Sequence, residues 1–284
     1  MKNKGRKTNR IWSLAIVLCL LLAAGCLIFT SVLGNLPRPK VEKTVAATPE
    51  VSLAPEPETS AEPTDTPAPN PITRSTSPAA LAKTGEAGAD YIDGIYFLGD
   101  KALKTLSEQD LLTGEERAQQ VWCPGGGVLD LNMLGTVTFR SPVTGNDVPA
   151  AEIVEVNHPK TVILLPSADN ANLLTETTLK AALNTLISGI LAEDPETHII
   201  LSSLTPIAAT YAYEDVTIEV INRVNGWIAA AAESNGVKYL DAAFELAGTD
   251  GFLPENYHNG DGMHLSAEGL KAWFECVKTH PYAG

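Results

Sequence analysis

The hydrophobic and polar positions divide this chain into three regions of different character. An uncharged, mostly apolar run over residues 11–34 comes first. Residues 35–90 follow, rich in proline, threonine and alanine and without an aromatic side chain. From residue 91 onwards, short apolar runs alternate with segments whose apolar residues recur every three or four positions. This alternation predicts one folded domain over 91–284, because only there can enough apolar surface be buried.

The third region alternates predicted strands with predicted helices. Four short apolar runs are typical of buried strands, namely 94–98, 161–165, 198–201 and 237–240. Helical periodicity over 174–193 and 216–232 separates the later strands. The order predicts an α/β fold with a three-layer, doubly wound parallel sheet of the flavodoxin-like kind. Functional side chains are then expected at the carboxyl ends of the strands.

The first region has the length of a membrane span. Its 24 residues, taken as a helix, exceed the roughly 30 Å hydrocarbon core of a bilayer. Five basic and no acidic side chains precede it in residues 1–10. We therefore expect a cytoplasmic tail over 1–10, a transmembrane signal anchor over 11–34 and an extracytoplasmic domain at the cell membrane. A cleaved secretory signal and a lipoprotein signal ending at Cys26 are the alternatives.

The second region predicts a disordered linker over 35–90. Ten of the nineteen prolines lie between residues 37 and 85. Such a composition buries too little apolar surface to offset the entropy of ordering the chain. In an extended polyproline conformation, at about 3.1 Å per residue, the linker would reach well over 100 Å.

Charge and cysteine content exclude two classes of function. The formal net charge is −14, and the only dense basic cluster lies in residues 1–10, so we expect no nucleic-acid partner. The four cysteines form no CxxC pair, which excludes a cysteine-rich zinc site. Cys123 and Cys276 lie outside the apolar run and could pair in an oxidising exterior.

The strongest chemical signal lies close to the C-terminus. Asp261 precedes His264 by three residues, just ahead of a predicted helix over 267–277. At this spacing the carboxylate can accept the imidazole Nδ1–H and leave Nε2 facing a cleft. Two other interpretations stay open. Asp261 and Ser266 could simply cap a turn and a helix, or His258, Asp261 and His264 could hold a metal. No distant fourth ligand is evident, so we predict no metal and no cofactor.

Two turns after predicted strands form the next candidates. Gly99, Asp100 and Lys101 end the first strand and open a helix, where α/β enzymes present a nucleophile. Alternatively, Gly99 makes the turn and Asp100 caps the helix. Gly125 and Gly126 follow a strand expected over 120–123 and offer backbone N–H groups for an oxyanion, or else form a flexible loop.

Taken in order, these elements resemble the SGNH (GDSL-type) hydrolase family over residues 91–280, notably its anchored bacterial extracytoplasmic members. Residues 91–100 resemble the first family block, whose next residue is the nucleophilic serine, and here that position is Lys101. The oxyanion glycine of the second block falls at Gly125 or a neighbour. Residues 261–265 match the Asp-x-x-His block.

The third family block, Gly-x-Asn-Asp, falls on residues 166–169 in this resemblance. Its glycine and asparagine are replaced there, and Asp169 is retained. Asn170 follows directly and is the amide available to stand in for the missing asparagine. Ser167 is the serine nearest by motif to the missing nucleophile.

The resemblance implies ester hydrolysis in which His264, oriented by Asp261, takes a proton from a serine hydroxyl. Lys101 cannot replace that serine at neutral pH, because an amine with a pKa near about 10.4 is protonated, and its charge is expected to disfavour an imidazolium at His264. We therefore expect a catalytically degenerate member that binds an acylated cell-envelope glycan, with Lys101 as a cation for a carboxylate or phosphate. The alternatives are an active esterase or acetylhydrolase that uses His264 and Asp261 with water or another nucleophile, and a protein-interaction module with an acidic surface.

Overall fold

A computed structural model describes residues 71–282 of the protein. The described residues belong to one compact unit. The predicted tail, the predicted anchor over 11–34 and most of the predicted linker lie outside the described residues. Within 71–282, no helix is both long enough and apolar enough to cross a membrane.

The centre of the domain is a seven-stranded sheet with the order β4-β3-β2-β1-β5-β6-β7. Its strands are β1 (Ile95–Gly99), β2 (Val121–Pro124), β3 (Phe139–Arg140), β4 (Asp147–Val148), β5 (Thr161–Leu165), β6 (His198–Ser202) and β7 (Lys238–Leu240). The five strands β2-β1-β5-β6-β7 are parallel and have the flavodoxin-like order expected from the sequence.

The sheet is mixed, however, and not wholly parallel as the sequence predicted. β3 pairs antiparallel with β2, and β4 pairs antiparallel with β3. The connection between β3 and β4 is a tight turn over 141–146, and so short a link can join only antiparallel neighbours. The added pair extends one edge of the sheet and holds Arg140 beside Asp147.

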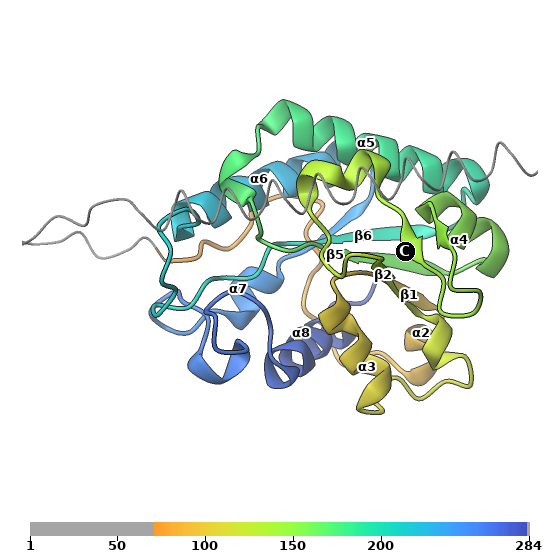
Figure 1. Ribbon diagram of the computed structural model, residues 1–284, viewed down its shortest axis with the longest axis horizontal. Helices are drawn as coiled ribbons and strands as arrows, with labels where there is room; N and C mark the ends of the chain where they lie inside the picture. The colour runs from red at the N-terminus through yellow and green to blue at the C-terminus, as the bar shows by residue number, and fades with distance from the viewer. Residues whose placement is uncertain (1–70, 283–284) are drawn as a thin grey trace, which may run out of the picture. The chain divides into compact units, whose positions relative to one another are not determined.

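Helices cover both faces of the sheet and complete the three layers (Figure 1). One face carries α4 (Ala150–Asn157), α5 (Glu176–Glu193) and α6 (Ile218–Ser234), and the other carries α2 (Ala89–Ile92), α3 (Thr105–Glu108), α7 (Ala242–Leu246) and α8 (Ala267–Thr279). Successive side chains of β1 point to opposite faces of the sheet and pack into the two helical layers alternately. Leu98 joins the core under α5 and α6, and Phe97 joins the core under α8, where its ring meets Trp273 edge-on.

The N-terminal segment of the domain corrects the predicted linker boundary. Ala80 pairs in parallel with Tyr239 of β7, and the Tyr239 N–H donates to the Ala79 carbonyl at 2.9 Å. Ile72 is buried as well. The prediction of disorder up to residue 90 is therefore wrong from residue 71 onwards. Edge strand β7 offers unpaired backbone groups, and pairing with them requires no hydrophobic periodicity in the added segment.

Both cysteines of the described residues are free thiols. Cys123 and Cys276 are buried in the core layer next to α8, and burial raises the pKa of each thiol to about 12. The disulfide considered from the sequence is not formed. Each side chain acts as a small apolar residue of the core.

Candidate functional site

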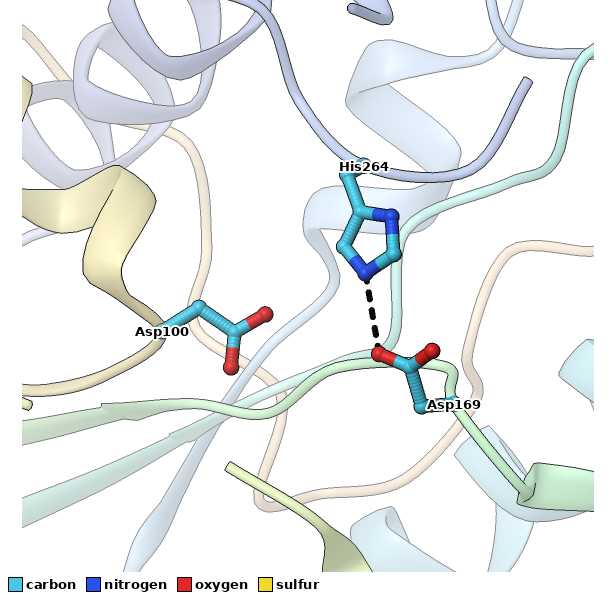
Figure 2. A group of neighbouring side chains, drawn as sticks. All are labelled: Asp100, Asp169 and His264. Carbon is cyan, nitrogen blue, oxygen red and sulfur yellow. Dashed lines mark hydrogen bonds and ion pairs between the residues drawn. The ribbon is translucent and has the colours of Figure 1, made fainter. Parts of the chain in front are cut away.

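Three ionisable side chains converge at the carboxyl edge of the parallel strands (Figure 2). Asp100 follows β1, Asp169 lies in the loop after β5, and His264 lies in the loop that leads into α8. Their nearest ligand-type atoms all lie within 4.8 Å of one another. The doubly wound topology explains this meeting, because loops after parallel strands share one edge of the sheet.

His264 is oriented by the hydrogen bond that the Asp-x-x-His spacing predicted. Nδ1 of His264 lies 2.7 Å from Oδ2 of Asp261. The other carboxylate oxygen of Asp261 accepts the backbone N–H groups of Met263 and His264, at 2.8 and 2.9 Å. Burial of Asp261 opposes ionisation, but the two backbone bonds and the His264 ring together lower the pKa of this carboxyl below its ordinary value. The Ser266 side chain caps the N-terminus of α8, which confirms the helix-capping role considered for Ser266 from the sequence.

The second nitrogen of the His264 ring is occupied by another carboxylate. Nε2 lies 2.9 Å from Oδ2 of Asp169. This hydrogen bond raises the pKa of His264 to about 9, with help from Asp261 and against the effect of burial. The same bond lowers the pKa of Asp169. At neutral pH the ring is therefore an imidazolium that donates both of its N–H groups to carboxylates.

Ser167 is the hydroxyl that the sequence placed nearest to the site. It is buried, and its Oγ donates to Oδ2 of Asp169 at 2.5 Å. The hydroxyl is thus held by the same carboxylate oxygen that holds His264, and Nε2 of His264 faces Asp169 instead of Ser167. In this arrangement the Ser167 hydroxyl donates to a carboxylate, and both nitrogens of the His264 ring contact other carboxylates.

Asp100 is held by a neighbouring loop. Its Oδ1 accepts the backbone N–H of Leu129 at 2.5 Å, and no side-chain cap bond forms at the short helix Lys101–Lys104. The capping role considered for Asp100 is therefore wrong. Burial is the main reason that the pKa of Asp100 is raised, and the negative charge of Asp169 adds to it. After Asp261 and Asp169, Asp100 is therefore the third carboxylate near the His264 ring.

Of the neighbouring residues Asp169 and Asn170, only Asp169 directs its side chain towards His264. Asp169 faces His264, whereas Asn170 is exposed in a left-handed conformation, with φ of 57°. The Asn170 amide Nδ2 donates to Oδ2 of Asp130 at 3.3 Å. The expectation that Asn170 supplies an amide to the site is wrong. The side chain that faces His264 is a carboxylate, which accepts hydrogen bonds where an oxyanion site needs a donor.

The sequence predicted that Lys101 lies beside His264, but the two side chains line different hollows. Its backbone N–H donates to the Gly127 carbonyl at 2.9 Å, and its side chain lies along Gly127 in a cleft of about 390 Å³. Gly125 and Gly126 line the same cleft. The expectation that Lys101 disfavours an imidazolium is also wrong, because the pKa of His264 is raised by its two carboxylate partners.

The cavity beside His264 is separate and small. It has a volume of about 40 Å³, and its lining includes Asp100, Ser167, Met263 and His264. Such a volume holds a water molecule or two and is too small for an acyl group with its alcohol. Gly125 and Gly126 do not line it, so the glycines predicted to form an oxyanion hole lie in a different hollow from His264.

His258 is a structural residue of the loop that carries Asp261. Its buried ring accepts the backbone N–H groups of Gly260 and Gly262 at Nδ1, each at 3.1 Å. The metal set of His258, Asp261 and His264 considered from the sequence is therefore not assembled. Within the part of the chain described, Asp100, Asp169 and His264 are the set with donor atoms close enough to hold a cation.

The fold and this site together define an α/β protein with the framework of a hydrolase centre. A family model described as the GDSL-like lipase/acylhydrolase family matches residues 131–272, which is half of the chain. The chain belongs to this family. No curated protein matches it by sequence.

Several solved structures are similar. A Streptococcus pneumoniae protein, provisionally described as a platelet activating factor, is 18% identical with a TM-score of 0.47, and the match covers 66% of this chain and 84% of the other. A GDSL-like lipase from Bacteroides thetaiotaomicron is 16% identical with a TM-score of 0.44, covering 64% and 84%. A DUF4886 family protein from Bacteroides uniformis is 13% identical with a TM-score of 0.45, covering 67% and 86%.

Proposed function

We propose that this chain is a catalytically degenerate GDSL-like protein that binds an acylated cell-envelope glycan and does not hydrolyse it. Its basic tail and apolar run would anchor it in the cell membrane through residues 11–34, with the folded domain outside the cytoplasm. Residues 35–70 would then form the spacer between the membrane and the domain. The acidic composition of the chain fits a carbohydrate partner better than a nucleic acid.

The protonation state of His264 carries this proposal. A general base must be neutral and must have a free nitrogen within reach of the hydroxyl it activates. His264 has neither property, because Asp261 and Asp169 hold its two nitrogens and raise its pKa to about 9. The position after Gly99 and Asp100 holds Lys101 in place of a serine. The site therefore lacks both a nucleophile and a base.

The oxyanion side of the reaction is altered as well. Transition states of acyl transfer place negative charge on the former carbonyl oxygen, and donors must face that oxygen. Asp169 and Asp100 present carboxylates to this region instead. Removing one oxyanion donor typically costs 100-fold or more in rate, and a carboxylate at that position adds repulsion.

The proposal is tested by measuring ester hydrolysis. The purified full chain and its His264→Ala variant are assayed with p-nitrophenyl acetate and with an acetylated oligosaccharide. We expect both proteins to match the uncatalysed rate, while the acetylated oligosaccharide still binds in calorimetry. Turnover by the parent protein that disappears in His264→Ala would overturn the proposal.

That second outcome would favour the esterase alternative, for which one observation speaks. The His264–Asp261 bond of 2.7 Å is the orienting half of a catalytic dyad. A water molecule in the cavity of about 40 Å³ beside His264 would then be the nucleophile. This mechanism requires His264 to lose its bond to Asp169, so hydrolysis would appear only at alkaline pH, above the His264 pKa of about 9.

A further inference from the structure

The cleft next to the former catalytic centre has a concentrated positive charge. It has a volume of about 390 Å³ and is lined by Lys101, Lys104 and Arg140 together with the turn over 124–127. Lys101 and Lys104 are exposed, and among residues 71–282 neither forms an ion pair with a carboxylate. Both ammonium groups are therefore available to a ligand.

The composition of the domain makes this cluster unusual. Residues 71–282 contain 12 lysine and arginine side chains against 28 aspartate and glutamate side chains. At least six of those basic side chains are paired with a carboxylate, among them Arg74, Lys83 and Lys278. Two unpaired lysines one helical turn apart in one cleft thus form a local positive field in a strongly acidic domain.

The backbone of the turn adds hydrogen-bond donors to the cleft. The Gly127 N–H donates to the Pro124 carbonyl at 2.8 Å and closes the turn. The amides of the two central residues, Gly125 and Gly126, take no part in that bond. A Cβ atom at Gly125 would lie 3.1 Å from Nη2 of Arg140 and 3.3 Å from Oδ1 of its partner Asp147, whereas Gly126 opens onto free space. Gly125 and Gly126 line the cleft, and successive backbone N–H groups of such a turn are donors of the kind that bind anions in backbone nests.

The chemistry of the three cations points to phosphate over carboxylate. The Arg140 guanidinium already donates two hydrogen bonds to the Asp147 carboxylate, with Nε–Oδ1 at 2.6 Å and Nη2–Oδ2 at 2.8 Å. Its bidentate geometry, which suits a planar carboxylate, is thus in use. The remaining donors are two lysine point charges and the turn amides, which suit an anion with oxygens in several directions.

We propose that the cleft formed by Lys101, Lys104 and the turn over 124–127 binds a phosphate group carried on a polyol or sugar chain. This inference rests on the proposed binding function and names the ligand chemistry of the cleft that contains Lys101. Lys101, at the position of the family nucleophile, would then serve as a ligand-binding cation. The small cavity at His264 is not part of this phosphate site.

Calorimetry on the full chain tests the inference with four probes: a glycerol phosphate oligomer, inorganic phosphate, a hexuronic acid oligomer and an uncharged oligosaccharide. The variants are Lys101→Ala, Lys104→Ala and the double variant. Lys271→Ala is the matched control, because Lys271 is an exposed lysine on α8 in another hollow. The three substituted lysines are all exposed, and equal melting temperatures will verify that each of the four variants is folded.

We expect the glycerol phosphate oligomer to bind more tightly than the hexuronic acid oligomer and to be displaced by inorganic phosphate. The double variant should bind it at least 10-fold more weakly, Lys271→Ala should match the parent, and added salt should weaken binding. Equal affinity in the parent and the double variant would overturn the inference, as would equal binding of the hexuronic acid oligomer or binding of inorganic phosphate alone. None of these results depends on the hydrolysis assay, so the proposed absence of catalysis stands or falls separately.

Discussion

The imidazole ring of His264 lies between two carboxylates, with Nε2 at 2.9 Å from Asp169 and Nδ1 at 2.7 Å from Asp261. Asp261 alone would orient the ring and leave a reactive nitrogen, which is the arrangement of a catalytic dyad. Asp169 occupies that nitrogen and changes the role of the ring. With both nitrogens held, the ring is the cation of a hydrogen-bonded cluster.

The first prediction concerns the pKa of His264. NMR titration of the full chain should give a value near about 9, since both ring N–H groups are held by carboxylates. Asp169→Asn removes the larger cause and should lower this pKa by at least one unit. Asp147→Asn is the matched control, because Asp147 pairs with Arg140 outside the site. An unchanged His264 pKa in Asp169→Asn would contradict the arrangement.

The second prediction is a pH dependence of stability. The folded-state pKa of His264 is raised above its ordinary 6.5, so the folded protein binds the proton more tightly than the unfolded chain does. The resulting stabilisation is complete below about pH 6.5 and is lost as the pH rises through about 9. After allowance for solvent screening of the partly exposed ring, we expect about 1–2 kcal/mol. Urea titrations at pH 6 to 10 give the free energy of unfolding of the parent and of His264→Gln. The parent value minus the variant value should fall as the pH rises. A flat difference would refute the linkage.

The third prediction concerns His258, which holds the loop bearing Asp261. His258→Ala leaves the N–H groups of Gly260 and Gly262 without their acceptor, and we expect a loss of about 1–3 kcal/mol in the free energy of unfolding. The His264 pKa should fall in the same variant, because Asp261 is less firmly placed. His158→Asn is the matched control. His158 is exposed and has a left-handed backbone conformation, which asparagine tolerates. The free energy of unfolding and the His264 pKa should both stay unchanged in this variant. A His258→Ala protein that is less stable but keeps the His264 pKa would show that the loop position does not depend on His258.

The fourth prediction tests the N-terminal boundary of the domain. A chain beginning at residue 64 keeps the pairing of Ala80 with Tyr239 and the burial of Ile72, and a chain beginning at residue 88 loses both. Burial of one isoleucine is worth about 1.5–3 kcal/mol, and the lost edge hydrogen bonds add to it. Urea denaturation should therefore show a clearly lower midpoint for the shorter chain. Equal midpoints would mean that residues 71–87 are a dispensable linker.

The parallel part of the fold was predictable because its strands are buried on both faces. Such strands form continuous apolar runs, and the predicted run over 161–165 coincides with β5. The two-residue strands β3 and β4 were missed, because a short edge pair carries almost no periodic signal. The segment over 71–81 was missed for a related reason, since its pairing with β7 depends on backbone groups and not on side-chain type.

The sequence by itself predicted the contact between Asp261 and His264, because a spacing of three residues in one loop can bring those two side chains together. It also determined that lysine follows Gly99 and Asp100. Only the tertiary structure decided that Asp169, 95 residues away in the chain, reaches the other side of the His264 ring, and that Lys101 lies in a different cleft. The physical reason is that side-chain direction at the end of a strand depends on the packing of neighbouring loops, and the charge of a histidine depends on every group that this packing brings within hydrogen-bonding distance.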